Sequence, residues 1–291
     1  MCYIRIVMII LDGKVARDAH TDKLKKDIKN IGFSPTLAII QVGDNPDSTL
    51  YIEQKKKFAL KIGVTVQHVL LPESATFGEL EDEIGKLNIN NSISGIIVQL
   101  PLPKHLDRED VIGLIDPKKD VDGLTDENQK LLTESKPRFI PATARGILSL
   151  LDFYKIDIEG KNIAVLGRSR LVGSPTALAL LHRGGNVSVC HSKTTNTREI
   201  TKGADIVVVA IGKPEFIDAS YIKDGAVVVD VGINTVLGPL DDEIPQRKVV
   251  GDVLFFEVAK VAGALSPVPG GVGPMTVLSL FENLLDASKT A

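Results

Sequence analysis

Short apolar segments recur along the chain, separated by longer segments in which apolar and polar residues are mixed. Nearly continuous runs of Val, Ile and Leu predict strands that are buried on both faces, as in a parallel sheet. The predicted strands are residues 36–42, 64–71, 96–100, 163–166, 186–190, 205–211 and 226–231.

The longer segments carry apolar residues three or four positions apart, which is the spacing of an amphipathic helix. The predicted helices cover residues 15–30, about 48–62, 77–87, 107–115, 143–154, 176–181 and the segment after residue 274. Ser48 is expected to cap the second of these helices and Gly63 to end it. The alternation of buried strands and helices predicts an α/β protein.

The length of 291 residues suits two domains, and a composition of 44% hydrophobic and 24% charged residues is typical of a globular protein. A formal net charge of −3 gives no reason to expect a nucleic-acid or membrane partner. Cys2 and Cys190 are too few for a disulfide framework, and the five histidines form no ligand motif. We therefore expect no metal and a cytoplasmic location.

The apolar run at residues 4–11 is too short to span a bilayer, and no small-residue cleavage site follows it. We therefore expect no signal peptide. Met8 offers a second start, in which case residues 1–7 would be an extension.

The strand at residues 163–166 leads through Gly167 into a turn and then a helix. This arrangement lets backbone N–H groups and a helix N-terminus approach a pyrophosphate. The glycines depart from the usual G-x-G-x-x-G spacing, because the chain has Gly167-x-Ser169-x-x-x-Gly173. The turn is thus typical either of a dinucleotide site or of an ordinary strand-to-helix connection.

The residues after the next strand favour one dinucleotide over the other. An NAD enzyme usually has an acidic residue here, which holds the ribose hydroxyls. This chain has Ser192 and Lys193 instead, and Arg168 lies in the preceding turn. A hydroxyl beside cations suits a 2′-phosphate, so the pattern favours NADP. The alternative is a mildly basic, solvated loop.

Tyr51 and Lys55 are four residues apart on a predicted helix and share a face, which Phe58 and Ile62 continue. A lysine on a partly apolar stripe loses solvation, which lowers its pKa and suits it to transfer a proton near neutral pH. The alternative is that Lys55 belongs to a solvated run of three lysines.

Gln99 ends a predicted strand, where a polar side chain would face the binding crevice, and Asp122 lies in a turn with Gly123. An ordinary strand end and a solvated acidic turn are the alternatives. In the loop at residues 269–274, five of the six residues are Gly or Pro. Such a loop is typical of a rigid wall against a ligand or of a connector between domains.

The candidate residues fall within motifs that occur in a fixed order. These motifs are Tyr51-x-x-x-Lys55-x-Lys57, Val98-Gln99-Leu100-Pro101, Lys119-Asp120-Val121-Asp122-Gly123, Gly167-Arg168-Ser169, His191-Ser192-Lys193-Thr194 and Pro267-Val268-Pro269-Gly270-Gly271-Val272-Gly273-Pro274. Together they resemble the methylenetetrahydrofolate dehydrogenase/methenyltetrahydrofolate cyclohydrolase family, from about residue 10 to the last predicted helix. Each motif is weak by itself, but the ordered set is specific.

The resemblance implies a multifunctional enzyme that oxidises 5,10-methylenetetrahydrofolate with NADP⁺ and hydrolyses the methenyl product to 10-formyltetrahydrofolate. These steps belong to one-carbon metabolism and serve purine biosynthesis. The resemblance also implies a homodimer of chains with two α/β domains and a cleft between them, the second a Rossmann-type dinucleotide-binding domain. The folate-binding domain would comprise residues 1–142 plus 268–291, and the NADP-binding domain residues 143–267.

The motif positions also imply roles for single residues. Lys55 would be the general acid and base of the hydrolysis, and Tyr51 would pack on the substrate. Gln99 would tune Lys55 by hydrogen bonding, and Asp122 would hold the pterin. Further substrate contacts would come from Leu100, Pro101, Pro269, Gly270 and Gly271, and cofactor contacts from Thr143, Gly167, Arg168, Ser169, Ser192 and Ile233.

Two segments depart from the family pattern. Residues 141–144 read Pro-Ala-Thr-Ala where the family has Pro-Cys-Thr-Pro, and residues 128–130 read Asn-Gln-Lys where it has Asn-x-Gly. These departures leave the balance of the two activities open. Two other classes stay open from the residues alone, namely a two-domain NADP dehydrogenase of the shikimate or amino-acid type and a non-catalytic dinucleotide sensor.

Overall fold

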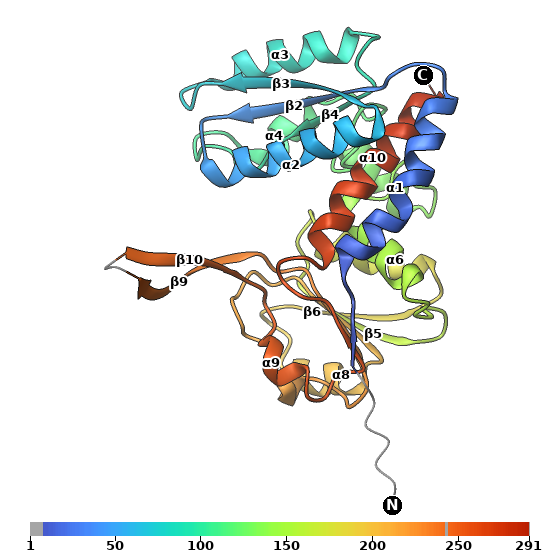
Figure 1. Cartoon of the computed structure of the whole chain (residues 1–291), viewed down its shortest axis with the longest axis vertical. Helices are drawn as coiled ribbons and strands as arrows, with labels where there is room; N and C mark the ends of the chain where they lie inside the picture. Colours follow the sequence, from blue (N-terminus) through green and yellow to red (C-terminus); the bar gives the residue numbers. More distant parts are fainter. Residues whose placement is uncertain (1–7, 242–243, 291) are drawn as a thin grey trace, which may run out of the picture. The chain divides into compact units, whose positions relative to one another are not determined.

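The computed structural model describes residues 8–241 and 244–290, which form two compact units (Figure 1). The three-stranded unit consists of residues 18–142 and the chain from residue 277 onward. The six-stranded unit consists of the residues up to 17 and residues 143–276. Among the described elements, three helices contribute residues to both units: α1 (Gly13–Asn30), α6 (Ala142–Phe153) and α10 (Val272–Thr290).

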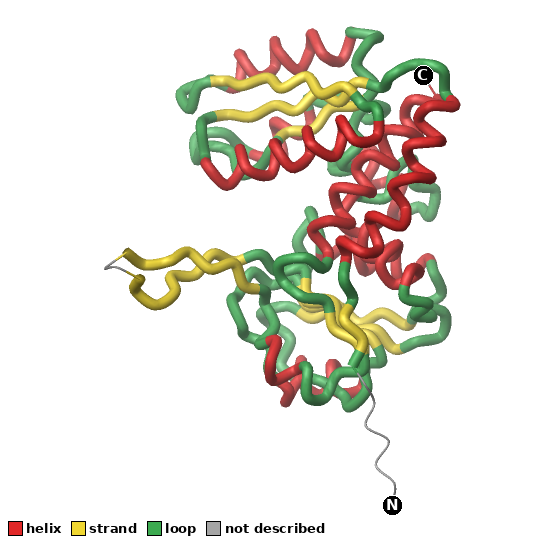
Figure 2. Tube along the Cα trace, in the orientation of Figure 1, coloured by secondary structure: helices red, strands yellow, loops and turns green. Residues whose placement is uncertain are grey.

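The three-stranded unit is built on a parallel sheet with the strand order β3-β2-β4, and α3 and α2 cover its opposite faces (Figure 2). Alternate residues of β2 point to the two faces, so Ala38 and Ile40 pack with Leu80 and Ile84 of α3. The elements of this unit are β2 (Thr36–Val42), α2 (Pro46–Ile62), β3 (Thr65–Leu71), α3 (Phe77–Ile89), β4 (Gly95–Val98), α4 (Arg108–Gly113) and α5 (Asp126–Thr133).

Residues of α10 complete the core of the three-stranded unit. The ring of Phe281 lies 5.6 Å, centroid to centroid, from that of Phe58 on α2. Asn283 is buried, and its Nδ2 donates to the backbone oxygens of Val121 at 2.8 Å and Ile140 at 3.0 Å. Because a buried amide is stable only when hydrogen-bonded, these bonds fix α10 to the segment that contains Asp122.

The six-stranded unit is built on a parallel sheet with the order β1-β11-β8-β7-β5-β6. Its sheet strands are β1 (Ile9–Ile10), β5 (Asn162–Leu166), β6 (Asn186–Cys190), β7 (Ile206–Val209), β8 (Val227–Asp230) and β11 (Ala264–Leu265). The chain passes from β5 to β6 on one side and then to β7 on the other. The order therefore reverses at the carboxyl end of β5, where open α/β sheets bind ligands.

Helices and a hairpin complete the six-stranded unit. The helical segments are α6 (Ala142–Phe153), α7 (Gly173–His182), α8 (Thr197–Gly203), the 3₁₀ turn η1 (Ala219–Tyr221) and α9 (Phe255–Val258). The antiparallel strands β9 (Asn234–Asp241) and β10 (Ile244–Val250) form a hairpin that extends away from the sheet (Figure 1).

The predicted α/β fold class is confirmed, because both units alternate parallel strands with helices and the six-stranded unit has Rossmann-type order. Each predicted strand occurs within a few residues of its expected position. Gly63 ends α2 in the left-handed region, with φ of 84°. Ser48 as the cap of α2 is wrong: the Asn45 side chain accepts from the backbone N of Asp47 and Ser48, at 3.0 and 3.1 Å.

Several elements are absent from the sequence prediction. The hairpin is missed because Gly238, Pro239 and Pro245 are loop signals, and β1 is missed because two residues carry no periodicity. The proposed extension, residues 1–7, lies outside the described residues. Across the described part of the chain, no helix has both the length and the apolar composition needed to cross a membrane.

Candidate active site

The structure brings Lys55 and Gln99 together in the three-stranded unit. Lys55 is half-buried on α2, and its Nζ donates a 2.7 Å hydrogen bond to Oε1 of Gln99, which directly follows β4. Gln99 Nε2 donates to the backbone oxygen of Leu100 at 2.8 Å. Because this second bond uses the amide nitrogen, the amide oxygen is left facing the lysine.

Lys55 differs in its surroundings from the lysines beside it. Burial lowers the pKa of Lys55, and the negative charge of Asp122 opposes that decrease. Lys56 forms a 2.8 Å ion pair with Glu53, and Lys57 is exposed. A solvated run of three equivalent lysines therefore does not describe this helix.

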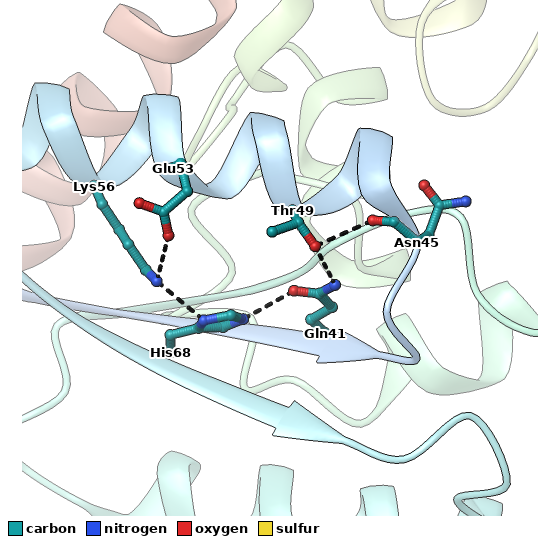
Figure 3. A network of polar contacts seen from close by, with 6 residues as sticks. All are labelled: Gln41, Asn45, Thr49, Glu53, Lys56 and His68. Atoms are coloured by element: carbon teal, nitrogen blue, oxygen red, sulfur yellow. Dashed lines mark hydrogen bonds and ion pairs between the residues drawn. The ribbon is translucent and has the colours of Figure 1, made fainter.

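A chain of hydrogen bonds holds the adjacent face of α2 to the sheet (Figure 3). Lys56 Nζ donates to His68 Nδ1 at 3.1 Å, so the other ring nitrogen carries the proton and donates to Gln41 Oε1 at 3.0 Å. Gln41 Nε2 donates to Thr49 Oγ1 at 3.1 Å, and Thr49 donates to the backbone oxygen of Asn45 at 3.2 Å. This chain fixes the rotation of the helix that carries Lys55.

Asp122 lies in a turn that another aspartate organises. Asp120 is buried and accepts from the backbone N of Gly123 at 2.9 Å and of Thr125 at 2.8 Å. It also accepts from Nδ2 of the buried Asn128 at 2.9 Å. The roles of Asp120 and Asn128 were not predicted from the sequence. The signal that could have identified Asp120 is its position as a second acidic residue, two residues before Asp122.

The surroundings of Asp122 favour its protonated form. The pKa of Asp122 is raised to about 6, because burial and the charge of Asp120 raise it by more than the charge of Lys55 lowers it. Lys55 and Asp122 therefore influence each other's charge, and both titrate closer to neutral pH than usual. Paired groups whose pKa values are moved in this way are typical of catalytic sites.

Tyr51, Leu100 and Pro101 lie on the same two elements as Lys55 and Gln99. Tyr51 is half-buried, and its pKa is raised by burial and by the charge of Asp47. Ser48 Oγ donates to the backbone oxygen of Leu100 at 3.3 Å, which joins α2 to the segment after β4. The Leu100–Pro101 peptide bond is cis.

In the six-stranded unit, the turn between β5 and α7 requires its two glycines. Gly167 has φ of 110°, and a Cβ there would overlap the carbonyl oxygen of Ala210. A Cβ on Gly173 would overlap the carbonyl of Gly167. Ser169 Oγ accepts from the backbone N of Val172 and Gly173, at 3.3 Å each, so the turn is compact.

The other predicted cofactor residues lie mostly at the same edge of this sheet. Arg168 and Ser169 follow β5, Ser192 follows β6 and Ile233 follows β8. Arg168, Ser169 and Ser192 are exposed, and the Ile233 side chain is 53% exposed. Thr143 instead lies in the first turn of α6, where its Oγ1 accepts from Thr276 Oγ1 at 3.5 Å.

The loop that contains Pro269, Gly270 and Gly271 packs against the start of α1. Gly13 N donates to the backbone oxygen of Gly270 at 2.9 Å, and a Cβ on Gly13 would overlap the oxygen of Gly271. Gly270 has φ of 112°, and the Val268–Pro269 peptide bond is cis. Glycine is thus required at both sides of this close approach.

The residues around the β5–α7 turn fit a dinucleotide. The turn ends at a helix N-terminus, where backbone N–H groups favour phosphate. Arg168 offers an exposed cation, and Thr176 Oγ1 on α7 is buried without a hydrogen-bond partner among the described residues. A parallel sheet with this turn, together with a lysine–amide–carboxylate site, defines a dinucleotide-dependent α/β enzyme.

Comparison with known proteins identifies the family. Residues 11–122 match the profile "Tetrahydrofolate dehydrogenase/cyclohydrolase, catalytic domain", and residues 141–291 match the NAD(P)-binding domain of the same family. The chain therefore belongs to the tetrahydrofolate dehydrogenase/cyclohydrolase family.

Related proteins resemble the chain over nearly its whole length. It is 45% identical to "Bifunctional protein FolD" of Agathobacter rectalis, over 96% of this chain and 99% of the relative. The crystal structure of the FolD enzyme from Campylobacter jejuni has a TM-score of 0.90 and 40% identity, covering 97% of this chain and 99% of that one. FolD of Trypanosoma brucei, complexed with NADP cofactor and inhibitor, has a TM-score of 0.91 and 36% identity, covering 97% and 98%.

The protein is thus a methylenetetrahydrofolate dehydrogenase and methenyltetrahydrofolate cyclohydrolase of one-carbon metabolism, with an NAD(P)-binding domain. The family expected from the ordered motifs is confirmed. Family membership also decides against a shikimate-type dehydrogenase and a non-catalytic sensor.

Proposed function

We propose that the protein oxidises 5,10-methylenetetrahydrofolate with NADP⁺ and hydrolyses the 5,10-methenyl product to 10-formyltetrahydrofolate, with Lys55 as general acid and base of the hydrolysis. The observation that carries this assignment is the 2.7 Å bond from Lys55 Nζ to Gln99 Oε1 at a half-buried position. Burial lowers the lysine pKa, which makes the neutral amine that a general base requires easier to form.

The hydrolysis needs a proton to be removed and then returned. Water adds to the cationic methenyl carbon and loses a proton, which gives a neutral carbinolamine. The carbon–N5 bond then breaks as N5 gains a proton and the carbinol hydroxyl releases its proton to solvent to leave the formyl group. Neutral Lys55 takes the first proton and, as the ammonium, delivers the second, so one group serves both halves of the step. Gln99 holds the Lys55 Nζ in place, and Asp122 accepts a hydrogen bond from the pterin ring.

The oxidation needs positioning more than proton transfer, because the folate nitrogen lone pair drives hydride departure from the methylene carbon. When bound, NADP⁺ supplies the hydride acceptor. Gly167, Arg168, Ser169 and Ser192 would hold its phosphates, with Ile233 and Thr143 beside it. The exposed cation and hydroxyls at this edge favour NADP⁺ over NAD⁺, since they can bind a 2′-phosphate.

We further propose that two parts of the chain bind different ligands. Residues 1–142 plus 268–291 bind the folate, including Tyr51, Leu100, Pro101 and the loop of Pro269, Gly270 and Gly271. Residues 143–267 bind NADP. A cytoplasmic homodimer that supplies one-carbon units to purine biosynthesis is also our proposal.

Replacing Lys55 tests the assignment. Lys55→Met should reduce the cyclohydrolase rate roughly 10²- to 10⁴-fold, the usual contribution of a general acid–base group, while part of the dehydrogenase activity remains. NADPH formation and methenyl absorbance are followed together, with methylenetetrahydrofolate and either NADP⁺ or NAD⁺. We expect methenyltetrahydrofolate to accumulate in step with NADPH.

The matched control is Lys57→Met, which removes an exposed lysine from the same helix and should leave both activities unchanged. Full hydrolysis by the Lys55 variant would refute the role of Lys55. Wild-type turnover with NAD⁺ alone would refute the proposed cofactor preference.

A further inference from the structure

Two aspartates are buried in the six-stranded unit without a cation beside them. Asp230 ends β8 and is 3% exposed, and Asp252 follows β10 and is fully buried. Neither forms an ion pair within the described residues. A buried carboxylate without a cation must be stabilised by hydrogen-bond donors. The donors therefore show which segments of the backbone each aspartate fixes in place.

Asp252 collects donors from two separate segments. Its Oδ2 accepts from the backbone N of Ile211 at 2.7 Å and of Gly212 at 2.9 Å, and its Oδ1 from that of Lys213 at 2.9 Å. A fourth bond, also 2.9 Å, comes from Nδ2 of Asn234 to Oδ1. Asp252 therefore joins the turn after β7 to the segment after β8.

Asp230 joins the same segment to the backbone of Asp252. Its Oδ1 accepts from the backbone N of Gly232 and of Asp252, and its Oδ2 from that of Val253, all at 3.0 Å. A Cβ on Gly232 would overlap the carboxyl group of Asp252, and one on Gly251 would overlap Oδ2 of Asp230. The two carboxylates thus pack directly against glycine backbone.

Ile233 lies between two residues that are hydrogen-bonded to the buried aspartates. Gly232, before it, donates to Asp230, and Asn234, after it, donates to Asp252. The side chain of Ile233 is 53% exposed, although both neighbours are hydrogen-bonded to buried groups. The two aspartates therefore fix the backbone on both sides of a side chain that points away from the core.

We propose that Asp252, supported by Asp230, is a positioning residue for the dinucleotide. It fixes the turn at residues 211–213 and the segment at residues 232–234 in the shape that the bound cofactor contacts. This assignment rests on the proposed function, because Ile233 is one of the proposed cofactor residues. Positioning matters here because small displacements of a binding segment can reduce the rate roughly 10²-fold.

Asp252→Asn tests the proposal with little change of size. Asparagine has one acceptor oxygen, and its NH₂ would face backbone N–H groups, so the four present bonds cannot all be kept. We expect the KM for NADP⁺ to rise tenfold or more and NADPH binding, followed by fluorescence, to weaken similarly. Cyclohydrolase activity, assayed with methenyltetrahydrofolate and no dinucleotide, should stay within twofold of wild type.

Asp205→Asn is the matched control. Asp205 precedes β7 at the opposite edge of the same sheet, and it accepts from Asn162 N at 3.0 Å and Lys223 Nζ at 2.7 Å. Its loss should leave the KM for NADP⁺ unchanged. An unchanged KM in Asp252→Asn, or an equal loss of both activities, would overturn the positioning role.

A second variant covers the case in which Asp252→Asn does not fold, as judged by circular dichroism. Asn234→Ala removes one of the four donors and leaves the carboxylate satisfied by three. We expect a rise of about threefold in the KM for NADP⁺, and no rise would overturn the proposal. Failure of the proposed function has a different signature, because the wild-type protein would then bind no NADPH.

Discussion

At the scale of single residues, the pair formed by Lys55 and Asp122 makes the pH profile of the hydrolysis predictable. The charge of Asp122 raises the pKa of Lys55, against the stronger lowering by burial. Asp122→Asn removes that charge, so the pKa of Lys55 should fall further. The acidic limb of the cyclohydrolase rate, on which Lys55 loses its proton, should move to lower pH.

The measurement is the cyclohydrolase rate from pH 5 to pH 9 in both proteins. The height of the profile also falls in the variant if Asp122 binds the pterin, so the position of the limb is the quantity to compare. A limb that stays in place, or moves to higher pH, would show that the two groups are not coupled as described.

Some residues of the candidate site could be predicted from the sequence and others could not. Lys55 and Gln99 could be selected from spacing and strand ends, and the structure brings them together. Asp252 could not be selected, because three of its four donors are backbone N–H groups of a turn that only the folded chain brings near. A carboxylate that binds backbone leaves no complementary residue type in the sequence.

At the scale of elements, the cap of α2 should affect both stability and catalysis. Asn45→Ala removes the side-chain acceptor for two backbone N–H groups and should reduce the free energy of unfolding by about 1 kcal/mol. Since α2 also carries Lys55, fraying of its first turn should lower the cyclohydrolase rate measured well below the melting temperature.

Thr76→Ala provides the comparison for this prediction. Thr76 caps α3 through a bond from Glu79 N at 3.3 Å, and α3 carries none of the proposed site residues. We expect similar destabilisation, measured by thermal unfolding, with an unchanged cyclohydrolase rate. Equal effects of the two variants on rate would mean that α2 does not depend on its cap for positioning Lys55.

Element prediction succeeded where the apolar pattern was long and failed where hydrogen bonding decided the structure. Residues 36–42 are a strand as predicted, because a nearly continuous apolar run of that length has few other ways to be buried. The cap was misplaced by three residues, since Asn45 and Ser48 are both good caps and only the path of the preceding loop distinguishes them.

At the scale of the whole molecule, two carboxyl groups with raised pKa values should each make a contribution to stability that falls as pH rises. Burial raises the pKa of Asp122 to about 6 and that of Asp230 to about 7, both above the usual value of a carboxyl group. Between about pH 4 and pH 7 these two groups therefore bind more protons in the folded protein than in the unfolded chain. The free energy of unfolding should decrease across this range.

Thermal unfolding from pH 4 to pH 8 measures this decrease. Asp122→Asn should reduce it by up to about 3 kcal/mol, the free energy that corresponds to the raised pKa. A decrease of the same size in the variant would exclude Asp122 as a source.

The contribution of α10 to the three-stranded unit also has a consequence for biosynthesis. This unit begins at residue 18, but Phe281 and Asn283 complete its core. A ribosome makes the whole of residues 143–276 before it makes those two side chains. While residues 143–276 are being synthesised, the nascent three-stranded sheet therefore exposes an apolar surface to which chaperones can bind. The three-stranded unit, most of which is synthesised before residue 143, is therefore completed only after the six-stranded unit.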